Sequence, residues 1–143
     1  MKDRRGFTLL EILVVVLIIS ILATIVGVGV AGKTGQAKIA KAHAQITIFQ
    51  TALDIYRMEQ GRLPTQEQGL RALVEKPTAP PVPDKYPSEG YLKSRKLPKD
   101  SWGNDYVYIM PGSLGEACEV ISYGSDGEPG GTGDAADISS SDL

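Results

Sequence analysis

A carboxylate lies inside an apolar run near the start of the chain. The stretch RRGFTLLEILVVVLIISILATIVGVGV, Arg4 to Val30, is apolar or small from Phe7 onward except for Glu11. An ionised side chain costs free energy in hydrocarbon, so a glutamate within a membrane span indicates a functional site that needs a partner. The chemistry expected of Glu11 is therefore that of a buried ion pair.

The C-terminal stretch YGSDGEPGGTGDAADISSSDL has the second set of candidate groups. Between Tyr123 and Asp137 it combines glycines with four carboxylates: Asp126, Glu128, Asp134 and Asp137. Calcium takes about six to eight oxygen ligands, and carboxylates with backbone carbonyls on a flexible chain can supply them. The EF-hand pattern D-x-D-x-D-G is absent. By composition alone the stretch is also typical of a disordered tail, and its Ser-rich end ISSSDL favours disorder.

Composition argues against catalysis and against nucleic-acid binding. The only histidine, His43, lies in a helical pattern, and the only cysteine, Cys118, lies in a strand pattern far from it in sequence, so no nucleophile and base are paired. Cys118 excludes an intramolecular disulfide, and we interpret it as a small buried hydrophobe. The net charge of −2 does not indicate an anionic partner.

The segment from Phe7 to Val30 is long enough to span a bilayer and too long for the apolar region of a signal peptide. We predict one transmembrane helix there. Basic residues flank both ends of the segment and leave its orientation open: Lys2, Arg4 and Arg5 before it, and Lys33, Lys38 and Lys41 after it.

After the span, a glycine-rich stretch from Gly27 to Gly35 predicts a locally soft helix. Apolar residues then recur in steps of three and four, which predicts one buried helix face ending near Gly61. These residues are Ile39, Ala42, Ile46, Phe49, Leu53 and Tyr56.

The remaining sequence predicts short elements. Thr65 and Gln68 form a capping box before a short helix that Pro77 ends, and the proline-rich stretch 76–90 predicts an irregular loop. Alternating residues in 105–110 and 117–122 predict a β-hairpin. The predicted fold is therefore α+β, with a long helix packed on a small antiparallel sheet.

Together these motifs resemble a known family. KDRRGFTLLEILVVVLII resembles the leader and first segment of type IV pilin-like prepilins: a basic leader ending in Gly6, then Phe7, then the carboxylate of Glu11. The stretches LPTQEQGLRALVEKP, LPKDSWGNDYVYIMPG and ISYGSDGEPGGTGDAADI resemble the major pseudopilins of type II secretion systems, the general secretion pathway protein G family.

The resemblance implies processing and a topology. A prepilin peptidase would cleave between Gly6 and Phe7 and methylate the new amine. The implied domains are a leader, 1–6, a transmembrane assembly segment, 7–30, and a periplasmic α+β domain, 31–143, on a single-pass inner-membrane protein.

The implied function is to polymerise into a periplasmic pseudopilus that drives folded exoproteins through the outer-membrane secretin. Minor pseudopilins and an inner-membrane assembly platform are the further implied partners. The lone Cys118 departs from true type IV pilins, which commonly close this region with a disulfide.

The resemblance also implies a partner for Glu11 and a metal for the tail. The α-ammonium of Phe7 on a neighbouring subunit would pair with Glu11 and set the register of assembly; the alternative is that Glu11 reaches the headgroups. One structural calcium ion would bind the family's ligand positions: Asp126, Asp134, Asp137 and the Tyr123 and Thr132 carbonyls, with Ser125 and Glu128 as further candidates.

Two other functions stay open at this point. One is a type IV pilin of adhesion or motility, against which the missing cysteine pair and the acidic tail argue. The other is a membrane-tethered, monomeric calcium-binding module. Cleavage after Gly6 and filament formation distinguish the leading hypothesis from the calcium-binding module.

Overall fold

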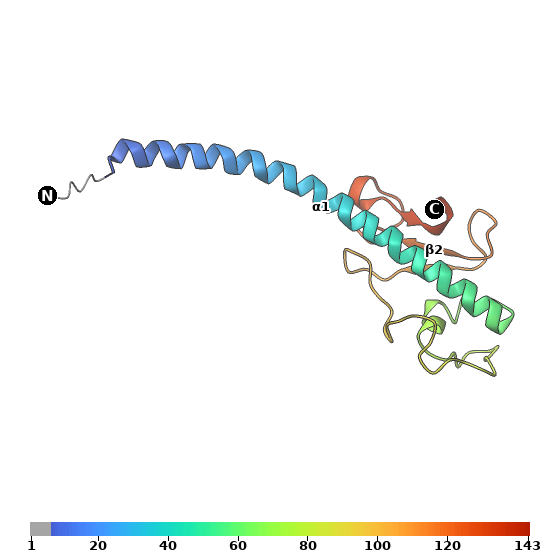
Figure 1. Cartoon of the computed structure of the whole chain (residues 1–143). Coiled ribbons are helices and arrows are strands. Elements are labelled where there is room, and N and C mark those ends of the chain that lie inside the picture. Colours follow the sequence, from blue (N-terminus) through green and yellow to red (C-terminus); the bar gives the residue numbers. More distant parts are fainter. Residues whose placement is uncertain (1–6) are drawn as a thin grey trace. The chain divides into compact units, whose positions relative to one another are not determined.

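The computed structural model describes residues 7–143, without the side chains of 25–33, and contains one long helix and a small sheet (Figure 1). Helix α1 is Leu9–Gln60. The chain divides into two compact units, Met1–Gln36 and Ala37–Leu143.

In the second unit, one face of α1 is buried in the core. Ala42, Ile46, Phe49, Leu53 and Tyr56 are all buried, as the three-and-four spacing predicts, and Ile39 packs against them partly buried. The helix ends at Gln60, and the next residue, Gly61, has a φ of 72°, a conformation that glycine adopts without steric cost. The predicted end near Gly61 is confirmed.

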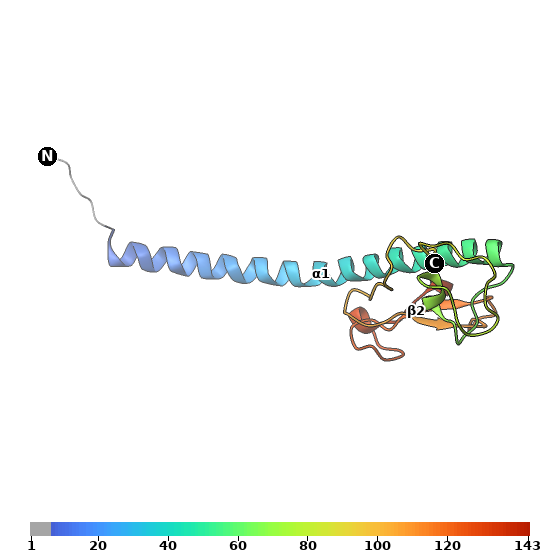
Figure 2. The same cartoon turned by 90° about the horizontal axis from the view of Figure 1, so that it is seen from below.

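The strands lie against this part of α1 (Figure 2) and form one antiparallel sheet in the order β1-β2-β3. Strand β1 is Val107–Ile109, β2 is Glu119–Ser122 and β3 is Ile138–Ser139. Tyr108 pairs with Val120 across the predicted hairpin, which is confirmed.

The third strand contradicts the interpretation of the tail as disordered. Ile138 pairs with Ser122 of β2, and the 3-10 helix η3, Ser140–Asp142, follows directly. Two hydroxyls tie the Ser-rich end to β2: Ser140 Oγ accepts a hydrogen bond from Val120 N, and Ser139 Oγ donates to Glu119 Oε1. A Ser-rich composition leads to disorder only where such hydrogen-bond partners are missing.

The segment after α1 contains a shorter helix than the sequence predicts. The capping box is present, since Thr65 N donates to Gln68 Oε1 at 3.1 Å and Gln68 N donates to Thr65 Oγ1 at 3.2 Å. Gly69 then has a φ of 55°, which interrupts the chain before the 3-10 helix η1, Leu70–Leu73. A second 3-10 helix, η2, is Gly133–Ala135, and residues 76–90 form the expected irregular loop.

Among the residues with a described placement, no helix combines the length and hydropathy that a membrane crossing requires. The predicted span 7–30 and the soft segment from Gly27 to Gly35 both include side chains outside the described residues.

Candidate functional site

The start of α1 places Glu11 in the first helical turn. Thr8 caps this turn, because its Oγ1 accepts a hydrogen bond from Glu11 N at 3.2 Å and its carbonyl accepts from Ile12 N at 3.2 Å. A carboxylate in this turn also interacts favourably with the positive end of the helix dipole. The sequence T-L-L-E has the spacing of a capping box, and this local signal is independent of the hydropathy of the segment.

Apolar side chains cover the helix after this turn and are exposed. Phe7 is 78% exposed. The other large apolar side chains as far as Leu22 are also exposed, each by at least 44%. The polar side chains among them are satisfied within the helix, since Ser20 Oγ donates to Val16 O and Thr24 Oγ1 to Ser20 O. This surface therefore suits an apolar environment. The predicted cleavage position Gly6 lies outside the described residues.

The acidic loop, defined here as residues 123–137, connects β2 to β3. Ser125 N donates to Asp134 O at 2.9 Å and thereby joins the two sides of the loop. Both carboxylate oxygens of Asp137 accept from Gly130 N, at 3.0 and 2.9 Å. The loop is folded back on itself by its own backbone amides.

The predicted calcium ligands are all in this loop, but their side chains do not converge. Asp126 Oδ1 accepts from Glu128 N at 3.2 Å, and the Thr132 carbonyl accepts from Ala135 N. Asp126, Asp134 and Asp137 are exposed. In the described part of the chain, no three His, Cys, Asp or Glu side chains are grouped closely enough to hold a metal.

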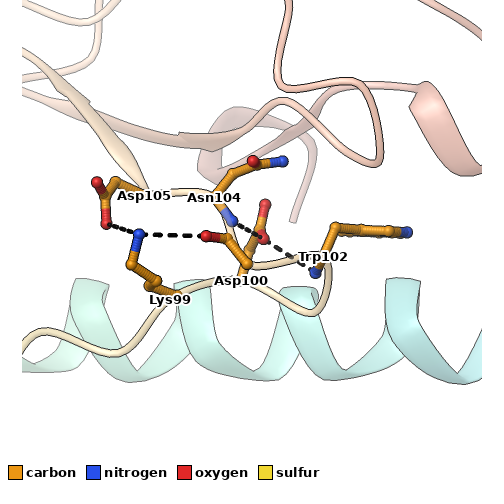
Figure 3. Close-up of polar contacts among 6 residues, drawn as sticks. Lys99, Asp100, Trp102, Asn104 and Asp105 are labelled. Atoms are coloured by element: carbon orange, nitrogen blue, oxygen red, sulfur yellow. Dashed lines mark hydrogen bonds and ion pairs between the residues drawn. The ribbon is translucent and has the colours of Figure 1, made fainter.

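A buried carboxylate lies beside the acidic loop and was not singled out by the sequence analysis. Asp100 is 7% exposed. Its Oδ1 accepts from Trp102 N at 3.0 Å and from Asn104 N at 2.7 Å (Figure 3), and its Oδ2 accepts from Ser122 Oγ at 2.7 Å. The nearby Lys99–Asp105 ion pair, by contrast, is on the surface.

The turn around Asp100 has a local signature in the sequence D-S-W-G-N. An aspartate that begins a turn and accepts from backbone amides two and four residues on is typical of this position, and Gly103 has the positive φ, 97°, that the turn requires. Burial, and then the nearby Asp100 carboxylate, raise the pKa of Tyr106 to about 12.

Cys118 lacks the features of an activated nucleophile. Cys118 is half-buried against the core, and burial raises the pKa of its thiol, which disfavours the reactive thiolate. His43 Nδ1 is buried without a hydrogen-bond partner among the described residues.

Comparison with known proteins decides the family. Residues 29–141 match the family model described as type II secretion system (T2SS), protein G, and residues 1–27 match that of the prokaryotic N-terminal methylation motif. The chain belongs to the type II secretion system protein G family.

Relatives named type II secretion system core protein G support this membership over nearly the whole chain. The chain is 46% identical to the Vibrio cholerae protein over 138 residues, 96% of this chain and 92% of the relative. It is 44% identical to the Pseudomonas aeruginosa protein, over 96% of this chain and 94% of the relative.

A solved structure agrees with the fold. The major pseudopilin from the type 2 secretion system of enterohaemorrhagic Escherichia coli matches with a TM-score of 0.67 and 41% identity, over 79% of this chain and 94% of that chain. The resemblance and the function class predicted from the sequence, a type II secretion pseudopilin, are therefore confirmed. A protein of this family with an N-terminal methylation motif is membrane-associated or periplasmic.

Proposed function

We propose that this member of the protein G family is the major subunit of a pseudopilus, acts by assembly and is not an enzyme. The observation that carries the proposal is the contrast along α1. Its C-terminal part buries an apolar face in the domain core, while every large apolar side chain described from Phe7 to Leu22 is exposed. Exposed apolar surface of this extent needs a bilayer or other subunits to cover it.

Processing would prepare this surface for assembly. We propose that a prepilin peptidase cleaves between Gly6 and Phe7 and methylates the Phe7 amine, in a single-pass inner-membrane protein whose C-terminal domain is periplasmic. The match of residues 1–27 to the N-terminal methylation motif supports this step. The pseudopilus would then work with minor pseudopilins, the assembly platform, the secretin and the exported proteins.

Glu11 would pair with the Phe7 ammonium of a neighbouring subunit. Either charge left alone in an apolar filament core is costly, so a subunit added at the wrong axial offset is penalised more than a correct one is stabilised. Because Thr8 Oγ1 accepts from the backbone amide of Glu11, a change of the Glu11 side chain leaves this cap in place.

Glu11→Gln therefore tests the charge separately from the helix cap. In cells that overproduce the secretion system, we expect sheared filaments to be lost in Glu11→Gln and retained in Ser20→Ala, which removes a polar side chain bonded within its own helix. Normal filament yield from Glu11→Gln would refute the pairing.

We also propose that the acidic loop binds one structural calcium ion. The donors fit this ion in kind, since Asp126, Asp134 and Asp137 offer hard oxygens, with the Tyr123 and Thr132 carbonyls, and Ser125 and Glu128 are further candidates. In the structure these side chains are apart, so calcium would draw them together, and its binding free energy would stabilise the loop.

A further inference from the structure

We propose that Asp100 and Asn104 are positioning residues that anchor the acidic loop to helix α1 and β2. By holding the loop in place they raise its affinity for calcium. The proposal rests on the calcium-binding function proposed for that loop. Neither residue lies within the loop, and the sequence offers no reason to count either as a metal ligand.

Asp100 fixes the end of β2 from which the loop starts. Its Oδ2 accepts from Ser122 Oγ at 2.7 Å, and Ser122 is the last residue of β2 and fully buried. The same Ser122 hydroxyl accepts from Gly124 N at 3.4 Å, one residue into the acidic loop. Breaking the hydrogen bonds of a buried carboxylate costs free energy, so Asp100 holds the junction between β2 and the acidic loop in one conformation.

Asn104 carries the contact into the loop itself. Asp100 Oδ1 accepts from Asn104 N (Figure 3). Asn104 O also accepts from Asp100 N at 2.9 Å, so the turn is closed from both sides. Held in this way, Asn104 Nδ2 donates to Gly124 O at 2.8 Å.

The loop is closely packed at the residues that Asn104 contacts. A Cβ at Gly124 would lie 2.7 Å from Asp134 O, so the two ends of the loop meet there. A Cβ at Gly127 would lie 3.4 Å from the Asn104 side chain. The Asn104 amide therefore supports both Gly124, where the loop closes, and Gly127, which follows Asp126.

The other side of the turn contacts the helix. Ser101 Oγ donates to Lys38 O at 2.9 Å, and Trp102 packs partly buried against the core. The turn 99–105 thus joins α1 to the acidic loop through residues that are not adjacent in sequence.

The test is hydrogen exchange of the full chain in detergent, first with calcium removed by a chelator. We expect Asn104→Ala and Asp100→Asn to speed amide exchange in the loop by about five- to tenfold, the effect of losing roughly one net hydrogen bond. The matched control is Asp105→Asn, which removes the exposed ion pair with Lys99 and leaves the anchor intact. Unchanged exchange of the buried α1 face shows that each variant is folded.

Calcium titration of the same proteins by calorimetry separates this inference from the metal proposal. We expect Asn104→Ala to bind calcium about five- to tenfold more weakly than Asp105→Asn. If the unaltered chain binds no calcium, the metal proposal fails while the chelator experiment still decides the anchor. Loop exchange in Asn104→Ala equal to that in Asp105→Asn would overturn the anchor.

Discussion

Glu119 is a carboxylate buried within the sheet, and hydrogen bonds satisfy it without a basic partner among the described residues. It is 5% exposed. Its Oε1 accepts from Ser139 Oγ at 2.6 Å and its Oε2 from Ser113 N at 3.0 Å. Hydrogen bonds from Ser113 and then Ser139 favour the ionised form and lower the pKa of Glu119.

The sign of this shift predicts acid sensitivity. A carboxyl whose pKa is lower in the folded state stabilises the fold above its unfolded pKa, about 4.3, and this contribution is lost as the pH falls through the folded value. We therefore expect the melting temperature to fall below about pH 5. Glu119→Gln should lower stability at pH 7 by about 1.5–3 kcal/mol and flatten the pH dependence.

Thermal melts at several pH values check this, with Glu67→Gln as the control because Glu67 is exposed. Equal slopes of melting temperature against pH for the unaltered chain and Glu119→Gln would contradict the role of Glu119.

At the scale of elements, the buried face of α1 supplies more core residues of the second unit than any other element does. Phe49 is fully buried, and its ring meets that of Tyr106 edge-on at 5.1 Å. We expect Phe49→Ala to cost about 3–5 kcal/mol of unfolding free energy, through lost transfer energy and a cavity. The neighbouring Ile48 is 51% exposed, so Ile48→Ala should cost about 0.5 kcal/mol or less.

Chemical denaturation of both variants is the measurement. Similar losses from Phe49→Ala and Ile48→Ala would mean that the assigned face of α1 is wrong.

The acidic loop gives a second prediction at this scale. Calcium should raise the melting temperature of the full chain in detergent, because an ion that binds only the folded loop stabilises it. Asp134→Ala should abolish the rise, while Asp142→Ala, outside the loop, should keep it. Identical melting curves with calcium and with chelator would contradict the proposed metal site.

Local patterns predicted the elements whose signals are contained in their own residues. The buried face of α1 and the β1–β2 hairpin follow from periodicity, which needs no distant partner. Strand β3 is two residues long and has no period to detect. The helix expected after Thr65 is a short 3-10 helix because Gly69 adopts a positive φ, which the capping box does not reveal.

The candidate sites divide in the same way. Glu11 is conspicuous because its apolar neighbours are adjacent in sequence. Asp100 is less so: its bonds to Trp102 and Asn104 are local, but Ser122, which bonds its second oxygen, comes close only in the folded domain.

At the scale of the whole molecule, the two units have different requirements. The second unit, Ala37–Leu143, closes its own core around α1 and the sheet. In the first unit, the large apolar side chains described from Phe7 onward have no core to enter. A subunit built in this way fits assembly, in which neighbours supply the missing contacts.

The most direct test of this account is the intact mass of subunits from filaments sheared from cells that overproduce the chain with its secretion system. The account predicts filaments whose subunits begin at Phe7 and are heavier than the unmodified chain from Phe7 by one CH2, the net gain when a methyl group replaces an amine hydrogen. Monomers alone, with residues 1–6 retained, would contradict it.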